Sequence, residues 1–320
     1  MQGRRRRRPG LKAGALSRRS QSPREKRHCV EDMARLLAAF GLPKKYLDFW
    51  DPIAHEHDEP SPQCLARVKR EIANVYTRPP QGIFIEPEET NITKIHAVIV
   101  GPAGTPYEGG LFHFIVKCPP NYPVSPPRVR NMTTDLGRVR FNPNLYANGM
   151  ICLSILGTWP GPCWNVTQNI VNVLLSIQSL LTENPYFNEP GHESEMNAGD
   201  SGRYNAVIRH ETIRVAVCDA VDACIKGSSL CPPALRKKIL KTFSESYDKY
   251  EKVVKENLHL SGYSMDDPFG DNHGTYSYEK LLARLQELNK LVKRRRATTA
   301  GSDDTAPSDV EQPEASSGRK

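Results

Sequence analysis

Three short runs of β-branched and aromatic residues, separated by turns, constrain the fold of this chain more than any other feature. They are "GIFIEP" from residue 82, "ITKIHAVIVGP" from residue 92 and "GLFHFIVKCP" from residue 110. Such runs, with turn residues like "YEGG" (107–110) between them, predict consecutive antiparallel strands. The third run is apolar on both faces, which predicts a sheet that is covered on both sides.

Helical patterns flank these runs. Before them, Ser61 is a cap, an apolar stripe recurs at helical spacing, and Pro79 ends the helix. After them, "PPNYPVSPPRVR" (119–130) is too rich in proline for a central strand and predicts a stiff loop that leads into a short strand. Further helices are predicted over 165–181, 203–225, 234–258 and 276–296. The sequence therefore predicts an α+β fold.

Composition divides the chain into five parts. The net charge is +8, but residues 1–28 hold eleven basic residues against one acidic residue, so the rest of the chain is close to neutral. We expect a disordered basic tail (1–29), an N-terminal helix and linker (30–59), a core domain (60–215), a helical extension (216–296) and a second disordered tail (297–320). A nearly neutral folded part does not predict a nucleic-acid groove.

Eight cysteines occur without a CxxC pair or a Cys/His metal spacing. No apolar region follows the N-terminal arginines as in a signal peptide, and no stretch reaches the roughly 20 apolar residues of a membrane span. We therefore expect an intracellular protein with reduced thiols, no metal and no membrane span. The basic runs at 4–8 and 291–296 favour a cytoplasmic and nuclear protein, although cations at a helix end also explain the second run.

One block carries a specific motif. "GPAGTPYEGGLFHFIVKCPPNYPVSPPRV" is followed by "FNPNLYANGMICLSIL", which begins at Phe141. This order of elements resembles the core of the ubiquitin-conjugating enzymes: a Gly-Pro to Gly-Gly hairpin, a Tyr-Pro loop, a Pro-Asn turn and then the catalytic cysteine. The resemblance covers about residues 60–215 and implies the fold of that family, with a four-stranded antiparallel meander and a catalytic-cysteine loop, here with an added C-terminal helical extension.

The resemblance implies that Cys152 accepts the C-terminus of ubiquitin, or of a ubiquitin-like modifier, as a thioester from an activating enzyme. The acyl group then passes to a substrate lysine or to a ligase cysteine. An ordinary cysteine, with a pKa of about 8.5, is only a few per cent thiolate at pH 7. Exchange between thioesters nevertheless needs little activation, because one thiolate replaces another. No cofactor is expected to bind, since ATP is consumed upstream by the activating enzyme.

Further roles follow from the same resemblance. Asn144 matches the residue that stabilises the oxyanion or its loop, although Asn beside Pro also caps turns. Asn142 stands where the family usually has His, so Asn142 and Pro143 are expected to organise the loop. Glu189 or Asn188 is the candidate gate for the incoming lysine. The loops expected to meet the activating enzyme and the ligases carry Tyr122, Pro123, Pro126, Pro127, Trp159 and Pro160. Large members of the family imply that the extra helices help to select an alternative activating enzyme.

Other classes stay open on the sequence alone. A non-catalytic scaffold or adaptor with the same fold, bearing an Arg-rich tail that binds nucleic acid or a membrane, would not need Cys152. A cysteine hydrolase would need a basic partner, for which His192 and His210 are the candidates. A lone cysteine is also often just a small core residue.

Overall fold

The helix before the sheet begins where the Ser61 cap predicts. The structure is a computed structural model that describes residues 49–300, with side chains to Ala297. The Ser61 hydroxyl accepts a hydrogen bond from the Cys64 amide at 3.1 Å, and α3 runs over Pro62–Thr77. The expected basic tail and N-terminal helix, and residues 301–320, lie outside the described residues. The apolar side chains that α3 buries are Cys64, Val68, Ile72 and Val75.

The predicted meander is confirmed. Its strands are β1 (Ile83–Glu88), β2 (Asn91–Val100), β3 (Leu111–Lys117) and β4 (Arg128–Asn131), antiparallel and in sequence order. The turn between β2 and β3 folds back on Gly101, whose amide donates to Gly110 and whose carbonyl accepts from Gly109. A Cβ at Gly101 would lie 1.8 Å from the Tyr107 carbonyl oxygen, so the turn requires glycine there.

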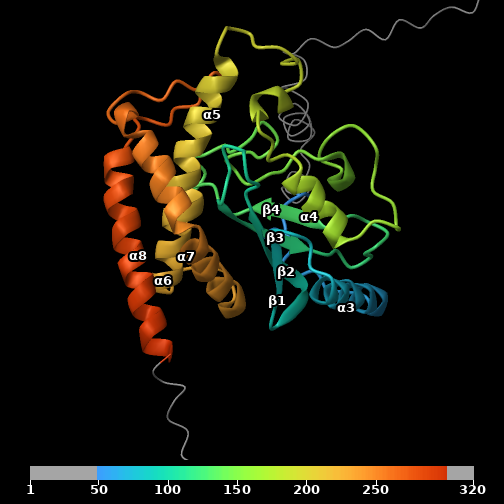
Figure 1. The fold of residues 1–320 in the computed structure, drawn as a ribbon. Helices are drawn as coiled ribbons and strands as arrows, with labels where there is room; N and C mark the ends of the chain where they lie inside the picture. The colour runs from blue at the N-terminus through green and yellow to red at the C-terminus, as the bar shows by residue number, and fades with distance from the viewer. Residues whose placement is uncertain (1–48, 301–320) are drawn as a thin grey trace, which may run out of the picture.

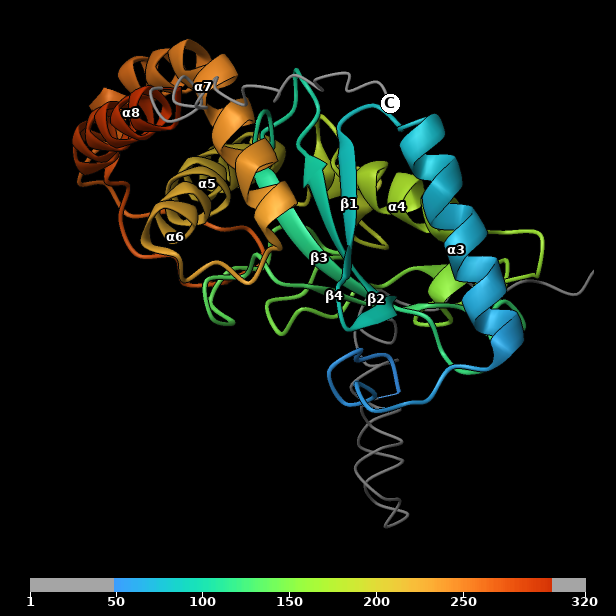
Figure 2. The ribbon, with the colours of Figure 1, turned by 90° about the horizontal axis from the view of Figure 1, so that it is seen from below.

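Both faces of the sheet are covered, as the third strand predicted. Figure 2 shows α3 on one side of the sheet and α7 (Pro233–Glu256) across the other. Phe112 and Phe114 belong to the core that includes α3, whereas Leu111 and Val98 belong to the core of the C-terminal helices. Alternating β-strand residues therefore serve two separate apolar layers.

The helix expected over 165–181 is shorter than predicted. Helix α4 runs over Ile170–Gln178, after a capping box between Asn169 and Asn172. The first residues of the predicted span form a turn instead, because the Asn165 side chain accepts from the Thr167 amide at 3.0 Å. The buried carboxylate of Glu71 in α3 accepts from the Ile170 amide at 2.9 Å, which fixes where α4 begins.

The helix that follows the core runs on into the C-terminal extension. Helix α5 (Asp200–Glu211) passes into a π-helix (Thr212–Asp219) and then into α6 (Ala220–Lys226). The boundary that we expected between residues 215 and 216 thus falls inside a continuous helical run, because the same helices cover the second face of the sheet. Helix α8 (Tyr278–Ala300) packs beside α7 and ends past the predicted residue 296 (Figure 1).

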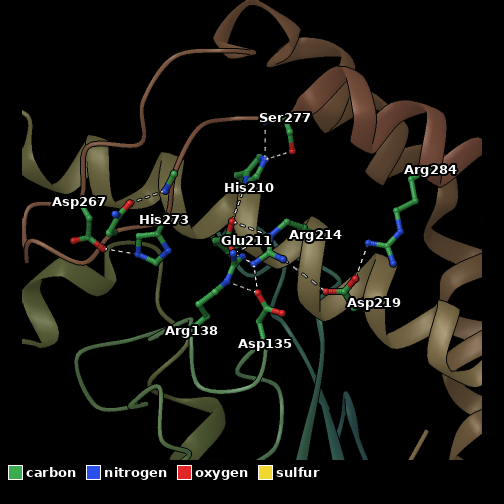
Figure 3. A network of polar contacts seen from close by, with 12 residues as sticks. Asp135, Arg138, His210, Glu211, Arg214, Asp219, Asp267, His273, Ser277 and Arg284 are labelled. Carbon is green, nitrogen blue, oxygen red and sulfur yellow. Dashed lines mark hydrogen bonds and ion pairs between the residues drawn. The ribbon is translucent and has the colours of Figure 1, made fainter. Parts of the chain in front are cut away.

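A polar network ties this extension to the loop after β4 (Figure 3). Arg214 of the π-helix donates to Asp135 at 2.7 Å and pairs with Glu211. His210 contacts Glu211 through Nδ1 at 2.9 Å, and its Nε2 accepts from the Ser277 amide at 3.0 Å. Ser277, just before α8, is therefore hydrogen-bonded to His210 near the end of α5. Among the helices within residues 49–300, none combines the length and the apolar character needed to cross a membrane.

Candidate active site around Cys152

Cys152 lies on an irregular segment that is held between two turns. The Cys152 residue is only 2% exposed to solvent. Before it, residues 146–150 form a tight turn in which the Gly149 amide donates to the Tyr146 carbonyl at 3.0 Å. After it, the Thr158 hydroxyl accepts from the Leu153 amide at 2.9 Å and donates to the Ile151 carbonyl. The backbone on both sides of the thiol is therefore fixed by hydrogen bonds.

The Asn-Pro-Asn turn lies directly against this segment. The Cys152 amide donates to the Asn144 carbonyl at 2.9 Å, and the Asn144 side-chain amide donates to the Cys152 carbonyl at 3.2 Å. Asn144 is half-buried, so part of this residue is exposed to solvent next to the Cys152 backbone. In this structure Asn144 stabilises the loop, and its amide stands next to the residue at which an acyl group would be attached.

Asn142 is buried, and both the nitrogen and the oxygen of its side chain form hydrogen bonds. Its side-chain amide donates to the Tyr107 hydroxyl at 3.0 Å and to the Leu180 carbonyl at 2.9 Å, while its oxygen accepts from the Asn144 amide at 2.9 Å. Tyr107 in turn donates to the Phe141 carbonyl at 2.7 Å. An asparagine offers both donor and acceptor groups. Here Asn142 links the turn between β2 and β3, its own Asn-Pro-Asn turn (142–144) and the segment that follows α4.

The two candidate gate residues are held close to this turn. The Asn188 amide donates to the same Leu180 carbonyl at 2.9 Å, so it supports Asn142 from the side. Glu189 accepts from Arg140 at 3.0 Å, and the same Arg140 nitrogen donates to the Pro143 carbonyl at 2.6 Å. Both residues come from the 3₁₀ turn Pro185–Asn188 or its cap.

Arg140 and Tyr146 are site residues that the sequence did not reveal. The Arg140 guanidinium carbon lies 4.8 Å from the centre of the Tyr146 ring. The pKa of the Tyr146 hydroxyl is raised, mainly by burial and further by the nearby Cys152. Tyr146 therefore keeps its proton at neutral pH and can donate to a thiolate. Burial opposes the charge of Arg140, but nearby Tyr204 and Glu189 raise its pKa overall.

Within the described residues, burial raises the pKa of the other buried thiols. Burial raises the pKa of Cys118 well above its ordinary value and raises that of Cys218 to about 12 and of Cys231 to about 11. Cys118 lies in the core as the strand pattern predicted. Within the described residues, the cysteines are not joined in disulfides. Cys152 has the Asn144 and Tyr146 side chains next to it, whereas Cys224 and Cys231 have the Ser229 hydroxyl.

Half of the expected partner surface is buried, which corrects the sequence interpretation. Tyr122, Pro123 and Pro127 are buried, because the Tyr122 hydroxyl donates to the Glu71 carboxylate at 2.8 Å and the Pro123 carbonyl accepts from Trp164 Nε1 at 2.8 Å. These residues shape the loop from within. Exposed or half-buried positions on the two loops are Val124, Pro126, Trp159 and Pro160. Pro126 and Thr158 line the same hollow, so the two loops meet.

The histidines of the hydrolase alternative are engaged elsewhere. His210 contacts Glu211 and Ser277, and the His192 ring packs against Tyr186 and Phe269. In the loop after α7, Asp267, Asp271 and His273 bring ligand atoms within 4.8 Å of one another. His273 and Asp267 already bond each other at 2.9 Å, and nothing else there points to a cation.

Comparisons with known proteins identify the family of this chain. A family model described as ubiquitin-conjugating enzyme matches residues 67–212. Ubiquitin-conjugating enzyme E2 Z from Xenopus tropicalis is 53% identical over 247 residues, which cover 76% of this chain and 78% of that protein. The Homo sapiens E2 Z is 53% identical over 252 residues, covering 78% of this chain and 70% of that protein. A fragment of the human dual E2 ubiquitin-conjugating enzyme/E3 ubiquitin-protein ligase BIRC6 is 37% identical over 186 residues, 54% of this chain and 4% of that protein.

These relatives support an enzyme rather than a scaffold that has lost its chemistry. Most of the chain, including the segment with Cys152 and the helices after it, has a counterpart in proteins named as conjugating enzymes. The chain belongs to the ubiquitin-conjugating enzyme family and is a ubiquitin transferase that works with activating enzymes and ligases.

Proposed function

We propose that Cys152 is the thiol that carries the modifier. The observation that carries the proposal is the pair of hydrogen bonds between Asn144 and Cys152. In charging, the Cys152 sulfur attacks the thioester carbonyl on the activating enzyme. A new carbon–sulfur bond forms, and the activating enzyme's cysteine leaves as a thiolate. Tyr146 stabilises the Cys152 thiolate by donating a hydrogen bond.

Discharge is the harder step. A lysine amine attacks the carbonyl of the Cys152 thioester, an oxyanion develops, and the amide bond forms as the thiolate leaves. The Asn144 side-chain amide already donates to the carbonyl of the residue that holds the acyl group. We propose that it supports the oxyanion, either directly or by fixing the surrounding loop. Transfer to a ligase cysteine follows the same course with a thiolate as nucleophile.

Glu189 is the better candidate for the lysine gate. Its carboxylate is linked through Arg140 to the Pro143 carbonyl, one residue from Asn144. A carboxylate there can orient an approaching ammonium group and help to remove its proton. Asn188 bonds the Leu180 carbonyl instead, so we assign it to loop support.

The partners are those of a carrier between an activating enzyme and a ligase. We propose that Val124, Pro126, Trp159 and Pro160 form the surface that meets them, since rigid proline and exposed apolar side chains bind at low entropic cost. The modifier is ubiquitin or a tandem ubiquitin-like protein. The C-terminal helices help to select an alternative ubiquitin-activating enzyme. The chain acts in the cytoplasm and nucleus, binds no cofactor, and depends on ATP only through the activating enzyme.

A charging assay tests this function. The protein is incubated with ubiquitin, ATP and each of two ubiquitin-activating enzymes, and products are separated on a non-reducing gel. We expect a shifted band that reducing agent removes. Cys152→Ala should abolish it, whereas Cys163→Ala, a change at an exposed cysteine, should leave it unchanged. A band that survives in Cys152→Ala would place the acceptor elsewhere.

A further inference from the structure

The loop between α7 and α8 reaches back to the catalytic turn. Its ends are fixed: the Ser277 amide donates to His210, and the Met265 amide donates to the Gly274 carbonyl at 2.9 Å. Within it, Asp267 accepts from the Phe269 amide at 2.8 Å and from His273 at 2.9 Å, a pair that Figure 3 shows at one side of the network. The Phe269 backbone is therefore held in place by its own loop.

The Phe269 ring lies on the core side of this loop. It stacks on Tyr186 with ring centres 5.3 Å apart and meets the edge of Tyr204 at 4.9 Å. The Arg140 guanidinium carbon lies 5.7 Å from the centre of the same ring. Phe269 belongs to the extension in sequence but packs with the core that contains α3 and the catalytic turn.

Arg140 connects Phe269 to the chemistry. From one nitrogen it donates to the Pro143 carbonyl and to Glu189, and its face covers the Tyr146 ring. Tyr146 lies near Cys152, which helps to raise its pKa. A guanidinium that contacts two aromatic rings loses part of its hydration and is limited to fewer orientations. The Phe269 ring thus restricts the position of the Arg140 side chain. Through Arg140 it also restricts the positions of the Asn-Pro-Asn turn and of Tyr146.

We propose that Phe269 is a positioning residue for transfer to lysine, and that it acts through Arg140 on the Asn-Pro-Asn turn. This inference rests on the proposed function of Cys152 as the acceptor. It gives the extension a second role besides partner choice: one of its side chains completes the active site. Small displacements of reacting groups slow a reaction strongly, so a support of this kind affects the rate of discharge more than the extent of folding.

The test separates discharge from charging. Each variant is charged with ubiquitin, the activating enzyme is stopped by chelating its Mg²⁺, and loss of the thioester is followed after adding free lysine. Phe269→Leu keeps an apolar side chain but removes the ring, and we expect discharge to slow about three- to tenfold. Phe269→Tyr keeps the ring and should restore a rate within about twofold of the wild type. Leu288→Ala, which truncates a buried residue in the other core, controls for loss of stability.

A double-mutant cycle shows whether Phe269 acts through Arg140. If it does, Phe269→Leu should change the discharge rate little in an Arg140→Lys background, so that the two effects are not additive. Additive effects, or a wild-type discharge rate in Phe269→Leu, would overturn the inference while charging at Cys152 stands. Failure of the unmodified protein to charge would overturn the proposed function and the inference together. Thermal unfolding of each variant identifies any that fail to fold. If Phe269→Leu fails to fold, the discharge rate of the conservative variant Phe269→Tyr is compared with that of the wild type.

Discussion

Asn144 and Cys152 are joined by two hydrogen bonds that run in opposite directions. The Cys152 amide donates to the Asn144 carbonyl at 2.9 Å, and the Asn144 side chain donates to the Cys152 carbonyl at 3.2 Å. One residue thus fixes the backbone of the other before a modifier binds. In an enzyme that must hold an acyl group still while a large partner presents a lysine, such pre-formed geometry reduces the reorganisation needed at the reaction.

Replacing Asn144 should therefore affect discharge more than charging. We expect Asn144→Ala to slow discharge to free lysine about 10²- to 10³-fold, the usual effect of losing an oxyanion donor. Charging should change less, because thioester exchange replaces one thiolate by another. Single-turnover charging and discharge rates, with Asn74→Ala at an exposed position of α3 as control, provide the measurement. Equal losses in both steps would argue for a general collapse of the loop.

Removing Glu189 should destabilise the protein. Both partners of the Glu189–Arg140 pair are largely shielded from solvent, so loss of the carboxylate leaves the guanidinium without its charge partner. We expect Glu189→Ala to lower the free energy of unfolding by about 2–4 kcal/mol, and Glu189→Gln by less. Chemical denaturation gives these values, with the exposed Glu183→Gln as control. A Glu189→Ala variant as stable as wild type would mean that the pair contributes nothing to folding.

Substitutions at Tyr122 and Val124 should affect different properties of the protein. The first should lower its stability, and the second should weaken its action with a ligase. Tyr122→Phe removes a buried hydrogen bond to the Glu71 carboxylate and should cost about 1.5–3 kcal/mol of stability, with unchanged charging of the folded protein. Val124→Ala, on the exposed part of the same loop, should leave stability within about 0.5 kcal/mol and slow ligase-dependent discharge. The opposite pattern would return Tyr122 to the partner surface.

Stability should fall in acid because of Glu211. Burial raises the pKa of Glu211, but hydrogen bonds from His210 and Arg214 outweigh it and lower the pKa from 4.5 to about 2. Because the folded value is the lower one, the ionised carboxylate stabilises the fold above pH 4.5, and this contribution is lost as the pH falls towards 2. The contribution amounts to at most about 3 kcal/mol.

Unfolding free energies of the wild type and of Glu211→Gln, measured from pH 6 down to pH 3, check this expectation. The difference between the two proteins should shrink as the pH falls. Two curves that stay parallel over this range would show that Glu211 is not the group responsible.

The elements that could be predicted are those with a repeating pattern or an ordered motif. The strands around Phe112 were predictable because their apolar residues face two layers. The ordered motif that ends at Cys152 pointed to the family, while the role of Cys152 itself stays a prediction. Tyr122 was misjudged because a tyrosine beside prolines looks exposed until its partner Glu71, from another helix, is known. Arg140 and Phe269 lie far apart in sequence, and no periodicity reports that a loop of the extension returns to the site.

The most direct measurement identifies the residue that carries the modifier. Cys152→Ser, charged with ubiquitin, should form a reductant-resistant ester in place of a thioester. Digestion and mass spectrometry should then find the modifier's C-terminal remnant on the peptide that contains position 152. A remnant on a different residue, or an ester that forms equally in a Cys152→Ala protein, would contradict the account.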